Sequence, residues 1–201
     1  IREALSNPVP LPFPKSEGVA SVFKRADEDL ELIFAEEFTK LLGKFAFCMN
    51  DADLKFQLKT LVAQKKWDYI YCVEKKLAGL FEGNSFPKIN QTALADCDVS
   101  VTSCNYLIAR TGSIVMSSAQ ESGRTVSVYA PVHICIAYVD QLVFDTRDAL
   151  KSIKETYGNK LPSFITFAAG PSRTADIEKT LVVGVHGPKE VYVFLVDKPS
   201  S

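Results

Sequence analysis

The sequence predicts an α/β fold in which helices cover both faces of a mostly parallel sheet. Helical segments with one apolar face alternate with short β-rich runs through most of the chain. Two late runs, residues 164–168 and 191–196, are almost entirely apolar, which is typical of strands buried on both faces. The chain has 201 residues, 47% of them hydrophobic and 23% charged, so a single globular core accounts for it.

The domain organisation predicted is an extended arm followed by one domain. Prolines at positions 8, 10, 12 and 14 alternate with other residues, which favours a polyproline II arm over residues 1–26. A ligand for an SH3-type module is the alternative interpretation of this segment. Residues 27–201 show no internal repeat and no shift in composition, so we expect one α/β domain.

The first half of this domain begins with a helix, a strand and a second helix. Apolar residues recur at three- and four-residue steps from Leu30 to Leu41, and Gly43 follows as a stop. Residues 44–49 form an apolar run of strand length. Asn50 is placed to cap the second helix, whose first turn carries Asp51 and Asp53 at the positive end of its dipole.

The same alternation continues to the end of the chain. We expect strands at residues 68–73, 98–101, 114–116 and 132–139, a short helix at 75–81, and a helical turn at 103–109. Thr146 is placed to cap a further helix that ends at Gly158. The two apolar runs named above complete the sheet.

Charge and hydropathy exclude several classes of partner. Lys and Arg total 23 against 24 Asp and Glu, so no positive field is available to attract nucleic acid. The longest apolar runs are far shorter than the roughly 20 residues that cross a bilayer. The first twenty residues also lack the apolar stretch of a signal peptide, so we expect a cytoplasmic protein with no membrane partner.

The five cysteines predict neither a disulfide framework nor a metal site. No two are spaced as CxxC, which zinc and iron–sulfur sites commonly require, and two histidines are too few for a histidine-rich site. Three of the cysteines lie in apolar stretches, where a free thiol packs as a small hydrophobe. We therefore expect reduced thiols, no metal ligands and no cofactor in this chain.

The first of three candidate ligand loops contains Thr111, Gly112 and Ser113. Glycine permits a close backbone approach, and the two hydroxyls can donate to an oxyanion. The alternative is an ordinary turn in which the hydroxyls bond to nearby backbone groups.

The second loop follows the apolar run at 164–168 and is predicted to open a helix. Its candidate ligand contacts are Gly170, Pro171, Ser172, Arg173, Thr174 and Asp176. Exposed N–H groups at a helix start favour anions, and Arg173 can pair with a carboxylate or phosphate. Alternatively, Asp176 and Glu178 already complement the helix dipole, and the loop is a structural cap.

The third loop carries His186 and Gly187 on a constrained turn, where a histidine can titrate near neutral pH. A turn histidine bonded to backbone is the alternative. His133 lies within an apolar run, which is more typical of a strand histidine than of a ligand. No nucleophile elbow, dinucleotide fingerprint or P-loop is present, so catalytic residues and enzymatic activity stay undetermined by motif.

Two of these loops carry a longer resemblance. The sequence GPSRTADIE at residues 170–178, followed by GVHGP at 184–188, resembles the signature of the LUD domain in LutC/YkgG-type lactate-utilization proteins. Residues 109–113 and 131–134 look like further segments of this family, so the resemblance covers about residues 1–195. It implies a fold similar to the NagB/RpiA/CoA-transferase group, with a ligand cleft at the strand ends.

The resemblance also implies a function. Family members are implicated in bacterial growth on L-lactate, acting with iron–sulfur subunits that oxidise lactate to pyruvate. Because this chain lacks the cysteine motifs of those partners, we expect an accessory subunit with iron–sulfur clusters only in its partners. The alternative is a stand-alone enzyme or binding protein for an anionic small molecule: a sugar phosphate, a CoA ester or a carboxylate.

Overall fold

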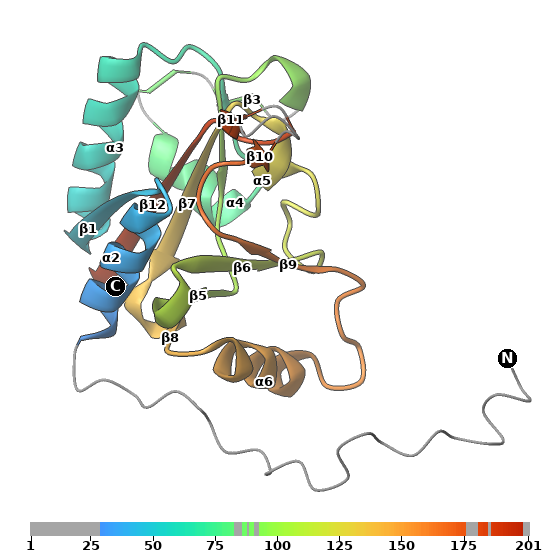
Figure 1. The fold of residues 1–201 in the computed structure, drawn as a ribbon. Coiled ribbons are helices and arrows are strands. Elements are labelled where there is room, and N and C mark those ends of the chain that lie inside the picture. Colours follow the sequence, from blue (N-terminus) through green and yellow to red (C-terminus); the bar gives the residue numbers. More distant parts are fainter. Residues whose placement is uncertain are drawn as a thin grey trace, which may run out of the picture.

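The computed structural model describes residues 29–82, 86–87, 89–90, 93–175, 181–184 and 186–198 (Figure 1). The described residues form a six-stranded sheet, a four-stranded sheet and a two-stranded hairpin, with helices packed around them. The predicted arm at residues 1–26 lies outside the described residues. None of the helices in the described part of the chain has the length and apolar character needed to span a membrane.

The six-stranded sheet is parallel throughout, as the sequence predicts. Its spatial order is β1-β12-β7-β4-β2-β3, and every neighbouring pair runs in the same direction. The strands are β1 (Lys44–Asn50), β12 (Glu190–Lys198), β7 (Val132–Tyr138), β4 (Val99–Thr102), β2 (Ile70–Tyr71) and β3 (Ile89–Asn90). Their carboxyl ends therefore meet along one edge of the sheet, which is where ligands bind in open α/β folds.

Helices cover both faces of this sheet, which confirms the predicted fold class. Side chains of β12 alternate between the faces: Val193 packs with α2 (Leu30–Lys40), and Phe194 packs with α3 (Asp51–Lys65). The short α4 (Lys75–Ala78) lies on the α3 side. Phe34 and Phe38 of α2 are fully buried, and truncating either to alanine would cost about 3–5 kcal/mol.

Local capping sets where α3 begins and ends. The Asn50 side chain accepts a hydrogen bond from the Asp53 N–H at 3.0 Å, as predicted, and Asp51 and Asp53 occupy the first turn. The helix ends at Lys66, which adopts the left-handed conformation. Because Asn50 is the last residue of β1, its N-cap places the start of α3 at the carboxyl edge of the parallel sheet.

The four-stranded sheet packs on the same face of the parallel sheet as α2. Its order is β8-β5-β6-β9, formed by β8 (Leu142–Val143), β5 (Tyr106–Ile108), β6 (Ser113–Ser117) and β9 (Ile165–Ala168). Leu107 and Ile114 pack into the same core layer as Phe38. On its other side α6 (Thr146–Tyr157) packs through Ala149 and Ile153 (Figure 1). Asp145, rather than the predicted Thr146, is the N-cap residue of α6.

Three predicted elements differ in the structure. Residues 103–109 were expected to contain a helical turn, but Tyr106–Ile108 forms β5, because antiparallel pairing with β6 outweighs weak local preference. Residues 164–168 were expected to form a strand buried on both faces. β9 instead pairs antiparallel with β6 and leaves Phe167 42% exposed. The predicted strand at 68–73 is reduced to the two residues of β2.

The remaining elements are short. They are α5 (Val126–Tyr129), the hairpin strands β10 (Arg173–Ala175) and β11 (Leu181–Val183), and 3₁₀ turns at Gly79–Phe81, Leu94–Asp96, Ala109–Thr111 and Val139–Gln141.

Candidate functional site

The second candidate loop does not open a helix at its described residues. Arg173–Ala175 forms β10 and pairs antiparallel with β11, with Thr174 opposite Val182. The predicted helix start is therefore wrong for residues 173–175, whereas the role of Arg173 and Thr174 as ligand contacts stays a prediction. A polar, hydroxyl-rich loop followed by a charged segment is compatible with either a helix start or a hairpin, and only pairing with β11 decides between them. Asp176 lies outside the described residues.

Residues 170–173, 184 and 186–188 form one contiguous group, which we call the loop cluster. The N–H of Ser172 donates to the carbonyl of Pro188 at 2.9 Å, and the N–H of Gly184 donates to the carbonyl of Ser172 at 2.9 Å. A Cβ on Gly187 would lie 2.8 Å from the Cβ of Ser172. The second and third predicted loops are therefore in direct contact.

The loop cluster also packs against the end of α2. Gly170 has φ of +76°, and a Cβ there would lie 2.4 Å from the carbonyl oxygen of Leu41. The Arg173 guanidinium donates to this same carbonyl, which satisfies a backbone acceptor at the helix end. Pro171 is buried beside these residues, and the Arg173 side chain is otherwise exposed.

The first predicted loop reaches the same helix from another direction. Gly112 has φ of +57°, and a Cβ there would lie 2.5 Å from the backbone nitrogen of Phe38. The Thr111 hydroxyl donates to the Ser113 hydroxyl at 2.9 Å, so each hydroxyl has a local partner. All three predicted loops therefore converge around the last turns of α2, directly or through one another.

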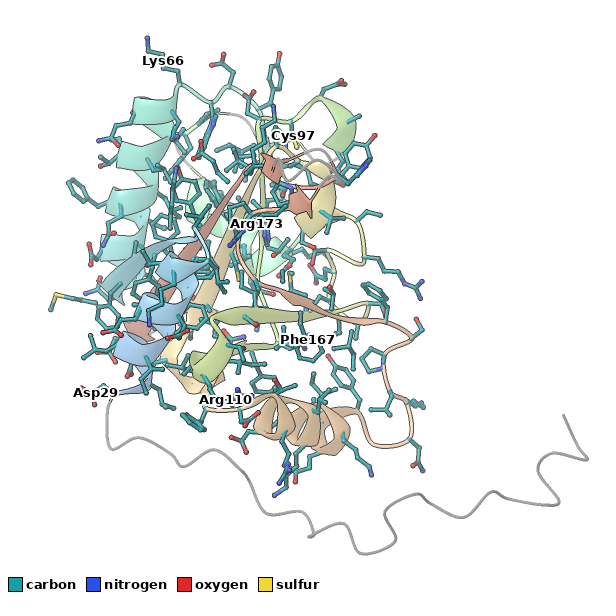
Figure 2. The ribbon with its side chains drawn as sticks, in the orientation of Figure 1. Asp29, Lys66, Cys97, Arg110, Phe167 and Arg173 are labelled. Atoms are coloured by element: carbon teal, nitrogen blue, oxygen red, sulfur yellow. The ribbon has the colours of Figure 1, made fainter. Side chains whose placement is uncertain are left out.

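Two arginines lie on opposite sides of β6 in the view of Figure 2. Arg110 binds both carboxylate oxygens of Asp145 at 3.2 Å and so ties the turn before β6 to the start of α6. Burial alone would raise the pKa of Asp145, but the hydrogen bonds and charge of Arg110, together with the backbone N–H groups of Arg147 and Thr146, lower it. Arg173 lies on the far side of β6 from α6 (Figure 2).

The two histidines occupy different environments. His133 is 1% exposed, and its Nε2 lies 2.8 Å from the Thr102 hydroxyl. Burial lowers the pKa of His133 to about 4, so the imidazole is neutral at pH 7. His186, in the loop cluster, is exposed.

A separate cavity lies at the carboxyl edge of the parallel sheet, and we call it the carboxyl-edge cavity. Its volume is about 870 Å³, within the range of small-molecule sites. It is lined by Asp51, Glu74, Lys76, Leu77, Ser103, Ile136, Tyr138, Asp140, Gln141 and Asp197. None of the candidate ligand contacts predicted from the sequence is among these lining residues.

Four strands deliver the polar groups of this cavity. Asp197 lies at the end of β12, Ser103 directly follows β4, and Asp140 follows β7 within two residues. Glu74 follows β2, and Asp51 is the first residue of α3. The lining therefore presents four carboxylates against a single ammonium group, that of Lys76.

Hydrogen bonds hold part of the lining in place. Gln141 accepts from the Tyr138 N–H at 2.8 Å and donates to the Cys104 carbonyl at 2.6 Å, so its amide has structural partners. The Tyr138 hydroxyl donates to Asp51 at 3.2 Å. Burial and the neighbouring Asp51 raise the pKa of Tyr138 to about 12, so it is a neutral donor.

The sequence does carry a signal for this cavity. An acidic residue stands within a few positions of the end of each of several apolar runs, as Glu74, Asp140 and Asp197 do. Because parallel strands end at a common edge, such residues converge in space although they are far apart along the chain. Most of the candidate ligand contacts predicted from the sequence lie instead in the glycine-rich loops.

All five cysteines are free thiols buried in the packing. Burial is the main reason that the pKa values of Cys48 and Cys72 rise to about 12, so both thiols are protonated at neutral pH. Within the part of the chain that the structure describes, no three His, Cys, Asp or Glu side chains are grouped as metal ligands.

Comparison with known families gives one match that spans most of the chain. A model of the LUD domain matches residues 33–196, which includes most of α2, nearly all of both sheets and the loop cluster.

Similar proteins include "Lactate utilization protein C" from Shouchella clausii, 39% identical over 112 residues, covering 55% of this chain and 48% of the relative. The protein of the same name from Oceanobacillus iheyensis is 34% identical over 115 residues, covering 56% and 49%. The chain thus spans about half the length of the curated relatives that it matches.

Among solved structures, a DUF162 family protein from Deinococcus radiodurans has a similar fold. It superimposes with a TM-score of 0.59 at 17% identity, covering 83% of this chain and 96% of that protein. At this identity the likeness concerns the fold alone.

Proposed function

The chain belongs to the LUD domain family, and from this membership we propose that it is an accessory subunit of an L-lactate utilization system. In this proposal iron–sulfur partner subunits accept the two electrons released when lactate is oxidised to pyruvate. This chain contributes a binding surface for its partners rather than redox groups.

One observation carries the proposal: the described residues of the family signature form a partly exposed surface in the folded chain. The backbone of Ser172 forms two hydrogen bonds with the third loop, and the side chains of Arg173 and His186 are exposed beside it. The relatives from Shouchella clausii and Oceanobacillus iheyensis are named for lactate utilization. A loop group joined by backbone hydrogen bonds, with an exposed arginine and an exposed histidine, is suited to contact a partner protein.

The thiol environments support assigning electron transfer to partners. The five thiols are buried in the packing, and those of Cys48 and Cys72 are protonated at neutral pH. Metal ligation requires thiolates, so burial works against their use as cluster ligands.

Gene replacement in the source organism tests this role. We expect deletion to abolish growth on L-lactate but not on glucose, and the wild-type chain to restore growth and to co-purify an iron-containing protein. Arg173→Ala with His186→Ala should restore neither, although the protein accumulates normally. Lys151→Ala, on the exposed face of α6, is the matched control and should behave as wild type. Unchanged growth on lactate after deletion would refute the proposal.

An anionic small molecule is the second candidate ligand for the loop cluster, because the exposed Arg173 guanidinium has more N–H donors than its bond to Leu41 uses. A thermal-shift series with lactate, pyruvate, sugar phosphates and CoA esters separates this candidate from the first. A shift that disappears in Arg173→Ala favours ligand binding. The absence of any shift, together with co-purification of an iron protein, favours the accessory role.

A further inference from the structure

We propose that the carboxyl-edge cavity binds a small organic cation that carries primary amines. This inference rests on the lining of the cavity and is independent of any role in lactate utilization. It concerns the edge of the parallel sheet where Asp140 and Asp197 lie, not the loop cluster.

The polar groups that face this cavity are mainly acceptors. Asp140 and Asp197 are exposed at its rim, Glu74 is buried at its wall, and Lys76 is the one cationic side chain in the lining. The Ser103 hydroxyl already accepts from the Gln120 amide at 3.0 Å. Acceptors that outnumber donors are complementary to a ligand rich in N–H groups, and their charge favours a cation.

Glu74 gives the cavity a buried charge with unused capacity. Its side chain is 8% exposed, and one carboxylate oxygen accepts from the Ser103 N–H at 3.0 Å. Among the described residues, no donor bonds to its other oxygen. Burying a carboxylate with incomplete partners costs free energy, and an ammonium group in the cavity would offset that cost.

The size and spread of the lining decide between a metal ion and an organic cation. The carboxylates come from separate strand ends, and no three acidic, cysteine or histidine side chains of the described residues are grouped as ligands for one metal ion. A cavity of about 870 Å³ instead has room for an extended molecule. A polyamine can place amines opposite several separated carboxylates at once.

The same lining disfavours the anions considered above. A phosphate or carboxylate in the cavity would meet four carboxylates and only one ammonium group. Like charges at close range raise the free energy of binding, particularly where water is partly excluded. Sugar phosphates, CoA esters and lactate are therefore poor candidates for this cavity.

Isothermal titration of the full chain with spermidine tests the proposal, with glucose 6-phosphate and lactate as anionic comparisons. We expect spermidine to bind and both anions to fail. Glu74→Gln keeps the acceptor for the Ser103 N–H but removes the charge, and should weaken spermidine binding about tenfold. Lys76→Met removes the competing cation and should strengthen binding about threefold.

Controls separate a site from general attraction of polyamines to an acidic protein. Glu155→Gln removes an exposed carboxylate on α6, outside the cavity, and should leave spermidine affinity unchanged. If Glu74→Gln fails to fold, as judged by its melting curve, Asp197→Asn and Lys76→Met still test the site with opposite expected signs. Absence of spermidine binding, equal effects of Glu74→Gln and Glu155→Gln, or weaker binding by Lys76→Met would each overturn the proposal.

Discussion

The loop cluster and the carboxyl-edge cavity differ in how tightly they are packed and in how many hydrogen-bond partners their polar groups have. In the loop cluster, backbone hydrogen bonds and close contacts leave little free space, as Gly170 against Leu41 illustrates. In the cavity, carboxylates such as Glu74 surround about 870 Å³ of open space with few partners.

The amino and carboxyl edges of the parallel sheet differ in how far their charges are compensated. At the amino edge, Glu190 is bonded by Lys44, Lys65 and Tyr192, so its charge is compensated. Burial alone would raise the pKa of Glu190, but these partners outweigh burial and lower it to about 2. At the carboxyl edge, the cavity lining contains four carboxylates and one lysine. Charge is balanced where it stabilises the fold and unbalanced at the cavity.

The tight packing of the loops gives the largest expected effect. Gly112→Ala should destabilise the fold by about 3 kcal/mol, because the new Cβ meets the α2 backbone and the residue has positive φ. Urea denaturation measures this difference. Gly123→Ala is the matched control: it also has positive φ, but no atom lies within 4 Å of its Cβ position. It should cost about 1 kcal/mol, and equal losses would contradict the packing argument.

The amino-edge network gives an intermediate effect that depends on pH. Glu190→Gln should lower the free energy of unfolding by about 1–2 kcal/mol at pH 7. Because the folded-state pKa is depressed, this stabilisation is present above the ordinary value near 4.5 and is lost as pH falls towards 2. The difference in free energy of unfolding between wild type and Glu190→Gln should therefore be smaller at pH 3 than at pH 7, as measured by unfolding curves at both pH values. A gap that widens at low pH would show that Glu190 does not act through these partners.

The carboxyl edge gives the smallest effect and the opposite sign. Asp140→Asn with Asp197→Asn should leave stability unchanged or raise it by about 0.5 kcal/mol, because repulsion within the cavity lining falls. Differential scanning calorimetry without added ligand checks this. A loss above about 1 kcal/mol would mean that these carboxylates stabilise the fold rather than serve a ligand.

The sequence predicts the fold well where periodicity is strong. The helix ending at Lys40, the Asn50 cap and the buried strands β7 and β12 all follow from apolar spacing and capping. Residues 103–109 and 173–175 were misassigned because their conformation depends on pairing with β6 and β11, which local preferences do not encode.

The candidate site is predicted less completely. The convergence of the loops around α2 depends on contacts such as Gly112 with Phe38, between residues far apart in the chain. The carboxyl-edge cavity depends on strand order, which brings Glu74 and Asp197 to one edge although no local motif links them. The roles of the predicted loop residues stay predictions, and the acidic residues at the strand ends are a second set to test.

The loop cluster and the carboxyl-edge cavity are separate regions, and we propose that only the cavity selects cations. An NMR titration with spermidine, following backbone amide shifts, tests it most directly. We predict shifts at Glu74, Ser103 and Asp197, no shift at Ser172 or His186, and no response at the cavity to lactate. Shifts confined to the loop cluster, or lactate-induced shifts at Glu74 and Asp197, would contradict the account.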